Sequence, residues 1–516
     1  MMRRNVLANA VGQAASIVLS IVSVPLYIHY LGVEAYGLVA FFSSLGAILS
    51  VLDLGLGTTA NREVARRRPG AAPDGNIRDL VRTLEAVYVA VGAFIALLII
   101  ASAGWIITRW ITDQHFPPST LYVALVVFGI SLGVRWPVSL YTGVLLGAER
   151  QVALNAAVIG VSVIRTAGAI LVIALVSRTL LAFLVWYLIS NALEVLIMAV
   201  LAWSVLPKGN TRPRIVPGLM RGIWRFSASV SGNSLLAAGL KQGDRLLITK
   251  LLPLRFLGYY AAANTAGTLL ATLARPVATA ALPRFTVLLA SGEKERLAES
   301  YHRLSQSVAI VVAPFAATLI FFAHDILRVW TRSEEIAANG STTFAVFGFA
   351  FLLNALMQVP FALQLAAGIT WIAIANNAVS IVVLLPLMYV LIKHFGIAGA
   401  GVSWALFNTV YFLLIPHVMH RYVLQGHVKR WILQDNIPFL VAALTIGWGV
   451  RLVRDTEGSR VILGISAVAG ALLYLVIVFA VSGMVREFVR DLLSRRGRPK
   501  LQPASATIGL DNHSKG

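Results

Sequence analysis

Residues 180–206 read LLAFLVWYLISNALEVLIMAVLAWSVL, and their one charged side chain is Glu194. A bilayer core about 30 Å thick is crossed by roughly 20 apolar residues, because a helix rises about 1.5 Å per residue. This stretch is therefore long and apolar enough to span a membrane. Similar apolar runs occur along the whole chain, at about residues 8–30, 36–60, 84–108, 120–147, 152–176, 224–250, 256–282, 304–323, 343–367, 371–393, 397–419, 437–453 and 460–483.

The composition places the whole chain, 516 residues long, in the membrane class. Hydrophobic residues make up 58% and charged residues only 13%, whereas soluble domains carry about 25% charged residues. Fourteen spans leave no room for a soluble catalytic domain, although the short run 437–453 with Pro438 allows twelve spans and an interfacial segment. The absence of cysteine excludes disulfides and thiolate metal sites. The first run is longer than a signal peptide and lacks a clear cleavage site, so we expect it to remain as a span.

The positive charges predict the topology. The chain has 43 Lys and Arg against 22 Asp and Glu. With the N-terminus inside, 28 of these cations fall in inward-facing loops and tails, and nine fall on the other side. The positive-inside rule therefore predicts cytoplasmic termini and an even number of spans. The excess charge anchors this topology against anionic lipid, so we expect no nucleic-acid partner.

Charged residues inside the apolar runs are the candidate site. A charge at the bilayer centre is costly, so such side chains should face other helices or a water-filled cavity. Lys250 lies near a membrane edge and is set aside, because its side chain can reach the headgroups. The remaining five cations are Arg135, Arg165, Lys241, Arg245 and Arg275, and the acids are Asp53, Glu194 and Asp244.

Five cations cannot all be neutralised by three acids, so we expect an anion to complete the site. Asp244 should pair with a neighbour, either Lys241 or Arg245, which share its helical face. A phosphate or pyrophosphate group suits the Arg fork, and a carboxylate drug or a sugar acid would also fit. The alternative is that each Arg forms a buried ion pair that only fixes helix packing. The acids Asp53, Asp244 and Glu194 are candidates for ion coupling or gating, with salt bridges that lock one state as the alternative.

Polar side chains also follow single helix faces. Spacings of four, three and four residues place Asn9, Gln13, Ser16 and Ser20 on one face of the first span. Asn264 lies eleven residues, about three turns, before Arg275. Both patterns suit a hydrated lumen, and close helix–helix packing is the alternative for the first span.

No pattern of an enzyme is present in the sequence. There is no Walker loop, no G-x-S-x-G elbow and no pair of histidines at zinc spacing. His417, His420 and His427 are interpreted as part of an interfacial loop. We expect a transporter without catalytic residues, metal or cofactor, driven by an ion gradient, a downhill substrate or both.

Two stretches suggest an internal repeat. Residues 31–38, LGVEAYGL, and residues 252–259, LPLRFLGY, are short turns of the same pattern, 221 residues apart. Six spans per half preserve orientation, so the halves would be parallel repeats related by an axis along the membrane normal. The basic loop 207–225 is the natural link between them.

Four motifs carry a family resemblance. They are PLYIHYLGVEAYGL at 25–38, LDLGLGTTANRE at 52–63, GYYAAA at 258–263 and GIAGAG at 396–401. The chain resembles Wzx-type polysaccharide repeat-unit flippases of the multidrug/oligosaccharidyl-lipid/polysaccharide exporter superfamily. The resemblance implies an all-α membrane fold of two six-helix bundles, to which this chain adds two C-terminal helices, for 12 to 14 spans. The corresponding divisions are 1–206, a linker at 207–225, 226–420, two spans at 421–484, and a basic disordered tail at 485–516.

The resemblance also implies a function in the bacterial cytoplasmic membrane. Such flippases move an undecaprenyl-pyrophosphate-linked oligosaccharide through a cationic central cavity by alternating access, with proton or sodium coupling. Membrane lipids, a polysaccharide polymerase and a chain-length regulator are the implied partners. The alternatives are a multidrug exporter of the toxin-extrusion type, which would need acids in the cavity, a peptidoglycan-precursor flippase, and a membrane glycosyltransferase or polymerase.

Overall fold

The computed structural model describes residues 18–53, 55–66, 77–111, 115–207, 212–219, 242–457, 460–487 and 490. All regular structure in these ranges is helical, as the sequence predicts. By length and composition, ten helical segments of this part are able to cross a membrane, and Val18–Leu31, Val33–Leu49 and Ile465–Val481 are shorter apolar helices. Most of the expected run at 224–250 and both termini lie outside the described residues. The count of fourteen spans and the cytoplasmic termini therefore stay predictions.

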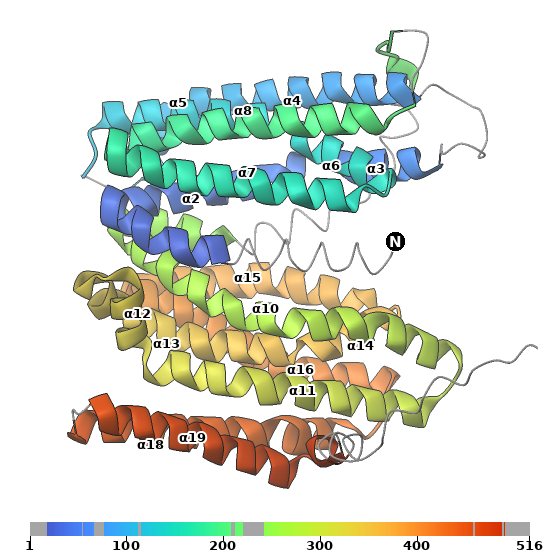
Figure 1. The fold of residues 1–516 in the computed structure, drawn as a ribbon, viewed down its shortest axis with the longest axis vertical. Helices are drawn as coiled ribbons and strands as arrows, with labels where there is room; N and C mark the ends of the chain where they lie inside the picture. The colour runs from blue at the N-terminus through green and yellow to red at the C-terminus, as the bar shows by residue number, and fades with distance from the viewer. Residues whose placement is uncertain are drawn as a thin grey trace, which may run out of the picture.

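The first lobe forms the upper half of Figure 1. After the helix Val18–Leu31, it contains α2 (Val33–Leu49), η1 (Ser50–Asp53), α3 (Leu56–Arg66), α4 (Ile77–Trp105), the π-helical turn η2 (Ile106–Trp110), α5 (Pro118–Arg135), α6 (Val138–Gly147), α7 (Gln151–Leu171), the π-helical turn η3 (Val172–Val176) and α8 (Leu180–Val205). Helix α5 packs between α4 and α8, while α6 and α7 both pack against α8. The side chain of Thr179 caps α8 by accepting a hydrogen bond from the backbone N–H of Ala182.

The second lobe lies below it and is centred on α13. It contains a helix over residues 242–251, then α10 (Leu254–Ala290), α11 (Lys294–Phe321), α12 (Ala323–Thr331), α13 (Glu334–Leu356), α14 (Gln358–Ala366), α15 (Thr370–Phe395) and α16 (Ile397–Tyr422). Helices α10, α11, α12 and α16 all pack against α13. Two further helices, which we call the extra pair, are α18 (Ile437–Glu457) and α19 (Arg460–Val481), preceded by α17 (Val428–Arg430) and the π-helical turn η5 (Trp431–Asn436). Helix α18 packs on α11 and α19 packs on α18, so the extra pair is attached to the second lobe.

Three of the predicted runs are broken in the structure, and one of them, 343–367, is divided at Met357 between α13 and α14. The run 36–60 is divided into α2, η1 and α3, with Gly55 at a φ of 68° just before α3. The run 120–147 is divided at Trp136 and Pro137, between α5 and α6, because proline has no N–H to continue the helical bonding. In contrast, α10 continues through Pro276 and Pro283.

The two lobes meet where α2 crosses α10. A Cβ atom added to Gly37 would lie 2.2 Å from the carbonyl oxygen of Leu254, and one added to Gly258 would lie 2.4 Å from that of Val33. Only glycine permits so close an approach of two backbones. The two glycines hold the same position in the repeated pattern of residues 31–38 and 252–259. The repeat therefore packs against its own copy.

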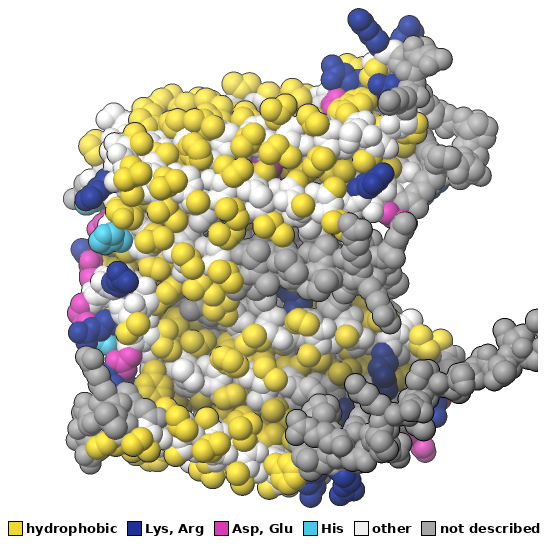
Figure 2. All heavy atoms as spheres, in the orientation of Figure 1, with side chains coloured by type: hydrophobic (Ala, Val, Ile, Leu, Met, Phe, Trp, Pro, Cys, Tyr) yellow, Lys and Arg dark blue, Asp and Glu magenta, His cyan; other side chains and the backbone are white. Residues whose placement is uncertain are grey.

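Further contacts between the lobes gather at the same end of the bundle. Trp330 Nε1 of α12 donates a hydrogen bond to the backbone oxygen of Ile21, at 2.8 Å. Lys250 donates to the backbone oxygen of Arg109. We call the other end of the bundle the basic end, because it holds Arg66, Arg150, Arg214, Lys294 and Arg430. Figure 2 shows a broad apolar band between these two ends and charged side chains gathered at both of them.

The link between the lobes is attached to the first lobe. The backbone N–H of Arg214 donates to Asp79 at 2.7 Å, and that of Val216 donates to the Thr83 hydroxyl at 2.9 Å. Both acceptors lie in the first turns of α4. The described part of the link, residues 212–219, is thereby held at the basic end.

Candidate functional site

Three of the predicted residues form one cluster in the middle of the first lobe. Arg135 of α5 donates from Nε to Glu194 Oε2 at 2.9 Å and from Nη2 to Oε1 at 3.3 Å. Arg165 of α7 donates to the same carboxylate. Glu194 of α8 is 4% exposed, while the Arg135 side chain is 45% exposed. Two guanidinium groups thus share one acid, which leaves a net positive charge.

Polar atoms beside this cluster are left without partners. Within the described chain, Arg165 Nε, Ser190 Oγ and Asn191 Oδ1 are buried and make no hydrogen bond. The amide of Asn191 donates to Ser131 Oγ at 2.8 Å. Buried polar groups are normally paired. These atoms therefore offer both donors and acceptors to a ligand.

An aromatic belt connects this cluster to the second lobe. The rings of Tyr27 and Phe183 are 5.1 Å apart, and those of Phe183 and Tyr187 are 4.9 Å apart. The guanidinium of Arg165 lies over the Tyr187 ring at 5.7 Å. Tyr36 of α2 lies near both Tyr187 and Arg245. The belt thus runs from the Arg165 side of the first lobe to Arg245 in the second.

Asp244 lies beside Arg245 and accepts side-chain hydrogen bonds from two neutral groups. The carboxylate is 3% exposed and accepts hydrogen bonds from the Tyr260 hydroxyl at 2.5 Å and from Trp404 Nε1 at 3.2 Å. Arg245 donates to it only through the backbone N–H, at 2.7 Å. Of the two expected partners of Asp244, the Arg245 side chain makes no ion pair with it in the described part of the chain, where Tyr260 and Trp404 donate to the carboxylate. Lys241, the other expected partner, lies outside the described residues.

The other predicted cations and polar residues are not gathered at this cluster. Arg275 is exposed on α10 just before Pro276 and forms no ion pair with a described residue, while Asn264 is half-buried three turns earlier. Ser20 is exposed, and Asn9, Gln13 and Ser16 lie outside the described residues. Asp53 accepts a hydrogen bond from the Tyr88 hydroxyl at 2.5 Å. It therefore lies at the end of α2, in η1, away from Glu194.

Sequence analysis missed one buried acid of the first lobe. Glu85 is 6% exposed and accepts hydrogen bonds from Tyr141 at 3.0 Å, Trp203 Nε1 at 2.6 Å and Arg82 at 3.0 Å. It is the second residue of the predicted run 84–108. An acid at the edge of an apolar run is the feature of the sequence that could have identified Glu85 as a buried polar residue. Glu85 and its partners stabilise the basic end of the first lobe.

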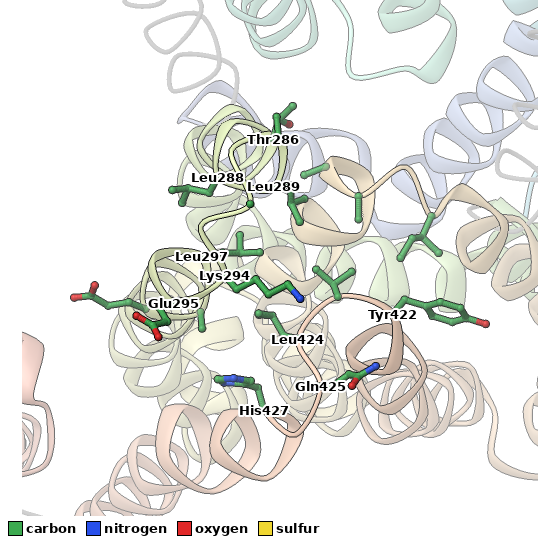
Figure 3. Close-up of a pocket in the computed structure, with 18 of the residues that line it drawn as sticks. Thr286, Leu288, Leu289, Lys294, Glu295, Leu297, Tyr422, Leu424, Gln425 and His427 are labelled. Atoms are coloured by element: carbon green, nitrogen blue, oxygen red, sulfur yellow. The ribbon is translucent and has the colours of Figure 1, made fainter.

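Two of the open clefts on the second lobe involve the segments around the extra pair. One has a volume of about 1210 Å³ and lies at the basic end, between the α10–α11 turn, the α14–α15 turn and the segment 422–430 (Figure 3). The other, of about 730 Å³, is an apolar groove between α11, α18 and α19, lined by side chains such as Ile310, Phe315 and Leu475. The extra pair therefore forms one wall of this second cleft, which is called the apolar groove below.

Comparisons with known proteins agree with this architecture. A family model described as "Polysaccharide biosynthesis protein" matches residues 30–333. A Shigella flexneri protein named "Putative O-antigen transporter" is 20% identical over 403 residues, which cover 78% of this chain and 94% of that protein. These matches confirm the resemblance that the sequence motifs indicate.

Two solved structures are similar in fold. The lipid II flippase MurJ in an inward closed conformation is 14% identical with a TM-score of 0.73, and the match covers 95% of this chain and all of that one. An inward-facing multidrug resistance transporter of the MATE family, in the MOP superfamily, is 14% identical with a TM-score of 0.62, over 80% of this chain and 96% of that one. At this identity, both likenesses concern the fold alone.

Proposed function

Because this chain belongs to the polysaccharide biosynthesis protein family, we propose that it flips a lipid-linked oligosaccharide across the bacterial cytoplasmic membrane. The chain is a multi-pass helical membrane transporter and not an enzyme. Its substrate would be an undecaprenyl-pyrophosphate-linked repeat unit of a surface polysaccharide. The name of the Shigella flexneri relative supports an O-antigen unit.

The observation that carries this proposal is the excess of guanidinium groups over acids at the cluster of the first lobe, with Arg245 on the other side of the aromatic belt. Arg135 and Arg165 share Glu194, and Arg245 lies across the aromatic belt without a bond from its side chain to a described acid. A pyrophosphate offers several oxygen acceptors, and an arginine fork matches them in bidentate fashion. We propose that Arg135, Arg165, Lys241, Arg245 and Arg275 attract this group, and that Asn9, Gln13, Ser16, Ser20 and Asn264 line its path.

The lipid tail would lie in the apolar groove. Its lining is almost entirely apolar, with Gly447 on α18 and Gly470 on α19. Gly447 lets α18 pack closely on α11, and Gly470 lets α19 pack closely on α18. An isoprenoid chain is apolar along its whole length, so a groove of this composition suits it. Headgroup and tail would then be held by different parts of the protein.

Sidedness follows from the positive charges. We propose that the basic end faces the cytoplasm. The lobes of this conformer are joined at the opposite end, so it would receive its substrate from the cytoplasmic side. Release outside would need the α2–α10 crossing to open and the lobes, residues 1–206 and 226–420, to move about the link at 207–225. A polysaccharide polymerase and a chain-length regulator would act on the released unit.

The net positive charge of the cluster favours this function over the export of cationic drugs. A carrier of cationic drugs would need an excess of acids, whereas two arginines share one glutamate here. A peptidoglycan-precursor flippase would handle the same kind of polyprenyl anion. Complementation of a strain that lacks its peptidoglycan-precursor flippase therefore separates the two: we expect no rescue.

Ion coupling would depend on the buried acids. Of Asp53, Asp244 and Glu194, we propose Asp244 as the coupling carboxylate, because the side chains that donate to it in the described part of the chain, Tyr260 and Trp404, are neutral. Glu194 would rather set the positions of the two arginines, and Asp53 would act at a gate.

The test is replacement of Arg165. Arg165→Ala should abolish surface polysaccharide while the protein stays in the membrane, and Arg165→Lys should restore little, because a lysine cannot form the fork. Arg178→Ala is the matched control, since Arg178 is exposed and stacks on Tyr30 at the end opposite the basic end. Polysaccharide is measured on gels in a deletion strain, and protein by immunoblot. Normal polysaccharide from Arg165→Ala would overturn the role given to the cluster.

A further inference from the structure

A chain of three polar side chains is buried where the extra pair joins the second lobe. His302 of α11 is 2% exposed and Asp435 of η5 is 0% exposed. His302 Nδ1 bonds Asp435 Oδ2, and His302 Nε2 lies 2.9 Å from His427 Nδ1. Gln306 donates to the other oxygen of Asp435 at 3.0 Å. Both nitrogens of the central imidazole are therefore engaged.

The geometry accommodates either of two protonation states. In the first, His302 donates its Nδ1 proton to the Asp435 carboxylate and accepts the Nδ1 proton of His427 at Nε2, so the three groups carry one negative charge. When a proton binds to His427 Nε2, the Nδ1 proton of His427 passes to His302 Nε2. His302 becomes an imidazolium beside the carboxylate, and His427 is neutral again. One proton is gained, and the buried group becomes neutral overall.

The outer histidine of this chain lines the cleft at the basic end. His427 is half-buried and shares the cleft wall with Lys294 and Arg430. Figure 3 shows the Lys294 side chain reaching into the cleft and Glu295 turned away from it. Burial, followed by the nearby His302 and Arg430, lowers the pKa of His427. A proton that enters here reaches His302 through the contact between His427 Nδ1 and His302 Nε2, and His302 is the ring that contacts the carboxylate.

The same groups tie the extra pair to the second lobe. Asp435 and Trp431 both belong to η5, and Trp431 Nε1 donates to Ser305 Oγ at 3.2 Å. Ser482, directly after α19, donates to Gln306 at 3.2 Å. An uncompensated charge at such a dry junction is costly. A π-helical turn inside a helix often marks a functional position.

We propose that Asp435, His302 and His427 form a proton-binding site, filled from the cleft at the basic end, that strengthens the attachment of the extra pair to the second lobe. Loss of the proton leaves the buried carboxylate without an opposite charge and loosens η5 and α18. The inference uses the proposed cytoplasmic position of the basic end, but not the identity of the substrate.

Other ionisable groups near the site come from three elements. The ring of Tyr301 of α11 packs edge-to-face against those of His302 and His420, with centroids 5.5 and 5.3 Å apart. His420 of α16 lies close to both His302 and His427 and to its own neighbour His417, and Arg430 of α17 lies close to His427. The measurement must therefore separate His302 from its neighbours.

The test is a pH titration of the purified full-length protein in lipid nanodiscs, with ¹⁵N-labelled histidine rings and no substrate. From about pH 9 to about pH 5, we expect one ring, absent in His302→Gln, to become an imidazolium. Asp435→Asn should lower its midpoint by about one pH unit or more, because the stabilising charge is lost. His115→Gln is the control, since His115 is exposed at the opposite end.

A second measurement follows the attachment of the extra pair to the second lobe. Hydrogen exchange at residues 431–445, corrected for the intrinsic effect of pH, should rise in wild type as the site loses its proton and should not depend on pH in His302→Gln. A His302 that stays neutral throughout, a midpoint unchanged by Asp435→Asn, or exchange that ignores the titration would each overturn the inference. Because no substrate is present, these outcomes are independent of whether the chain flips an oligosaccharide.

Discussion

The crossing of α2 and α10 makes a quantitative prediction about the conformational equilibrium. In Gly37→Ala, the new Cβ would lie 2.2 Å from the Leu254 carbonyl oxygen and 3.1 Å from the Gly258 nitrogen, whereas ordinary contacts begin at 3.4 Å. Both neighbours are backbone atoms of a helix and cannot turn aside, so the two helices must separate by about 1 Å. Overpacking of this kind costs about 1–3 kcal/mol. A cost of about 2 kcal/mol changes an equilibrium about 30-fold, here against the conformer with the lobes joined at this end.

The assay is a distance measurement between spin labels at Val176→Cys and Val329→Cys. These residues are 77% and 78% exposed at the ends of η3 and α12, one in each lobe. The chain has no cysteine, so no native residue needs replacement. Gly37→Ala should add a population at longer distance. Gly104→Ala is the control, because a Cβ there meets nothing within 4 Å. Identical distance distributions for wild type and Gly37→Ala would refute the packing argument.

Three further predictions concern side-chain substitutions. Glu85→Leu should destabilise the protein by about 2 kcal/mol, because the buried hydroxyl of Tyr141 and Nε1 of Trp203 lose their acceptor. Thermal unfolding in detergent measures this loss, and the control Glu295→Leu, at an exposed position, should change the stability little. The double variant Ala467→Phe with Ala471→Phe should fill the apolar groove and slow transport of a long-tailed substrate in proteoliposomes at least tenfold. The control Val468→Phe, at a position that is 62% exposed, should not slow it. Equal transport rates for the double variant and wild type would show that the substrate does not use the groove. Asp244→Asn should leave transport in the same proteoliposomes indifferent to imposed proton and sodium gradients, so a gradient response equal to that of wild type would exclude Asp244 as the coupling group.

Much of the first-lobe cluster could be predicted from sequence. Glu194 is a single charge in a long apolar run, and such a residue must find a partner. Arg135 and Arg165 are charges of the same kind in neighbouring spans, and the structure brings all three together. The partners of Asp244 could not be found in this way. Tyrosine and tryptophan are apolar by composition, so a count of charges overlooks them as hydrogen-bond donors.

The proton-binding site could not be predicted from the sequence, for a different reason. His302 and Asp435 are 133 residues apart, and each lies just before the apolar run to which it belongs. The helices extend beyond these runs, since α11 begins at Lys294 rather than near residue 304. The breaks between α2 and α3 and at Pro137 are local events inside runs of uniform hydropathy. Hydropathy thus locates the membrane segments but not the polar contacts at their ends.

The attachment of the extra pair to one lobe has a consequence for transport. All three helices of the apolar groove, α11, α18 and α19, belong to the second lobe or pack on it. When the lobes move against each other, the groove would travel as a unit, and a hydrocarbon held in it would keep the same neighbours from the start of a cycle to its end. The polar part of a cargo would change its surroundings at every step, while its anchor would never need to be released.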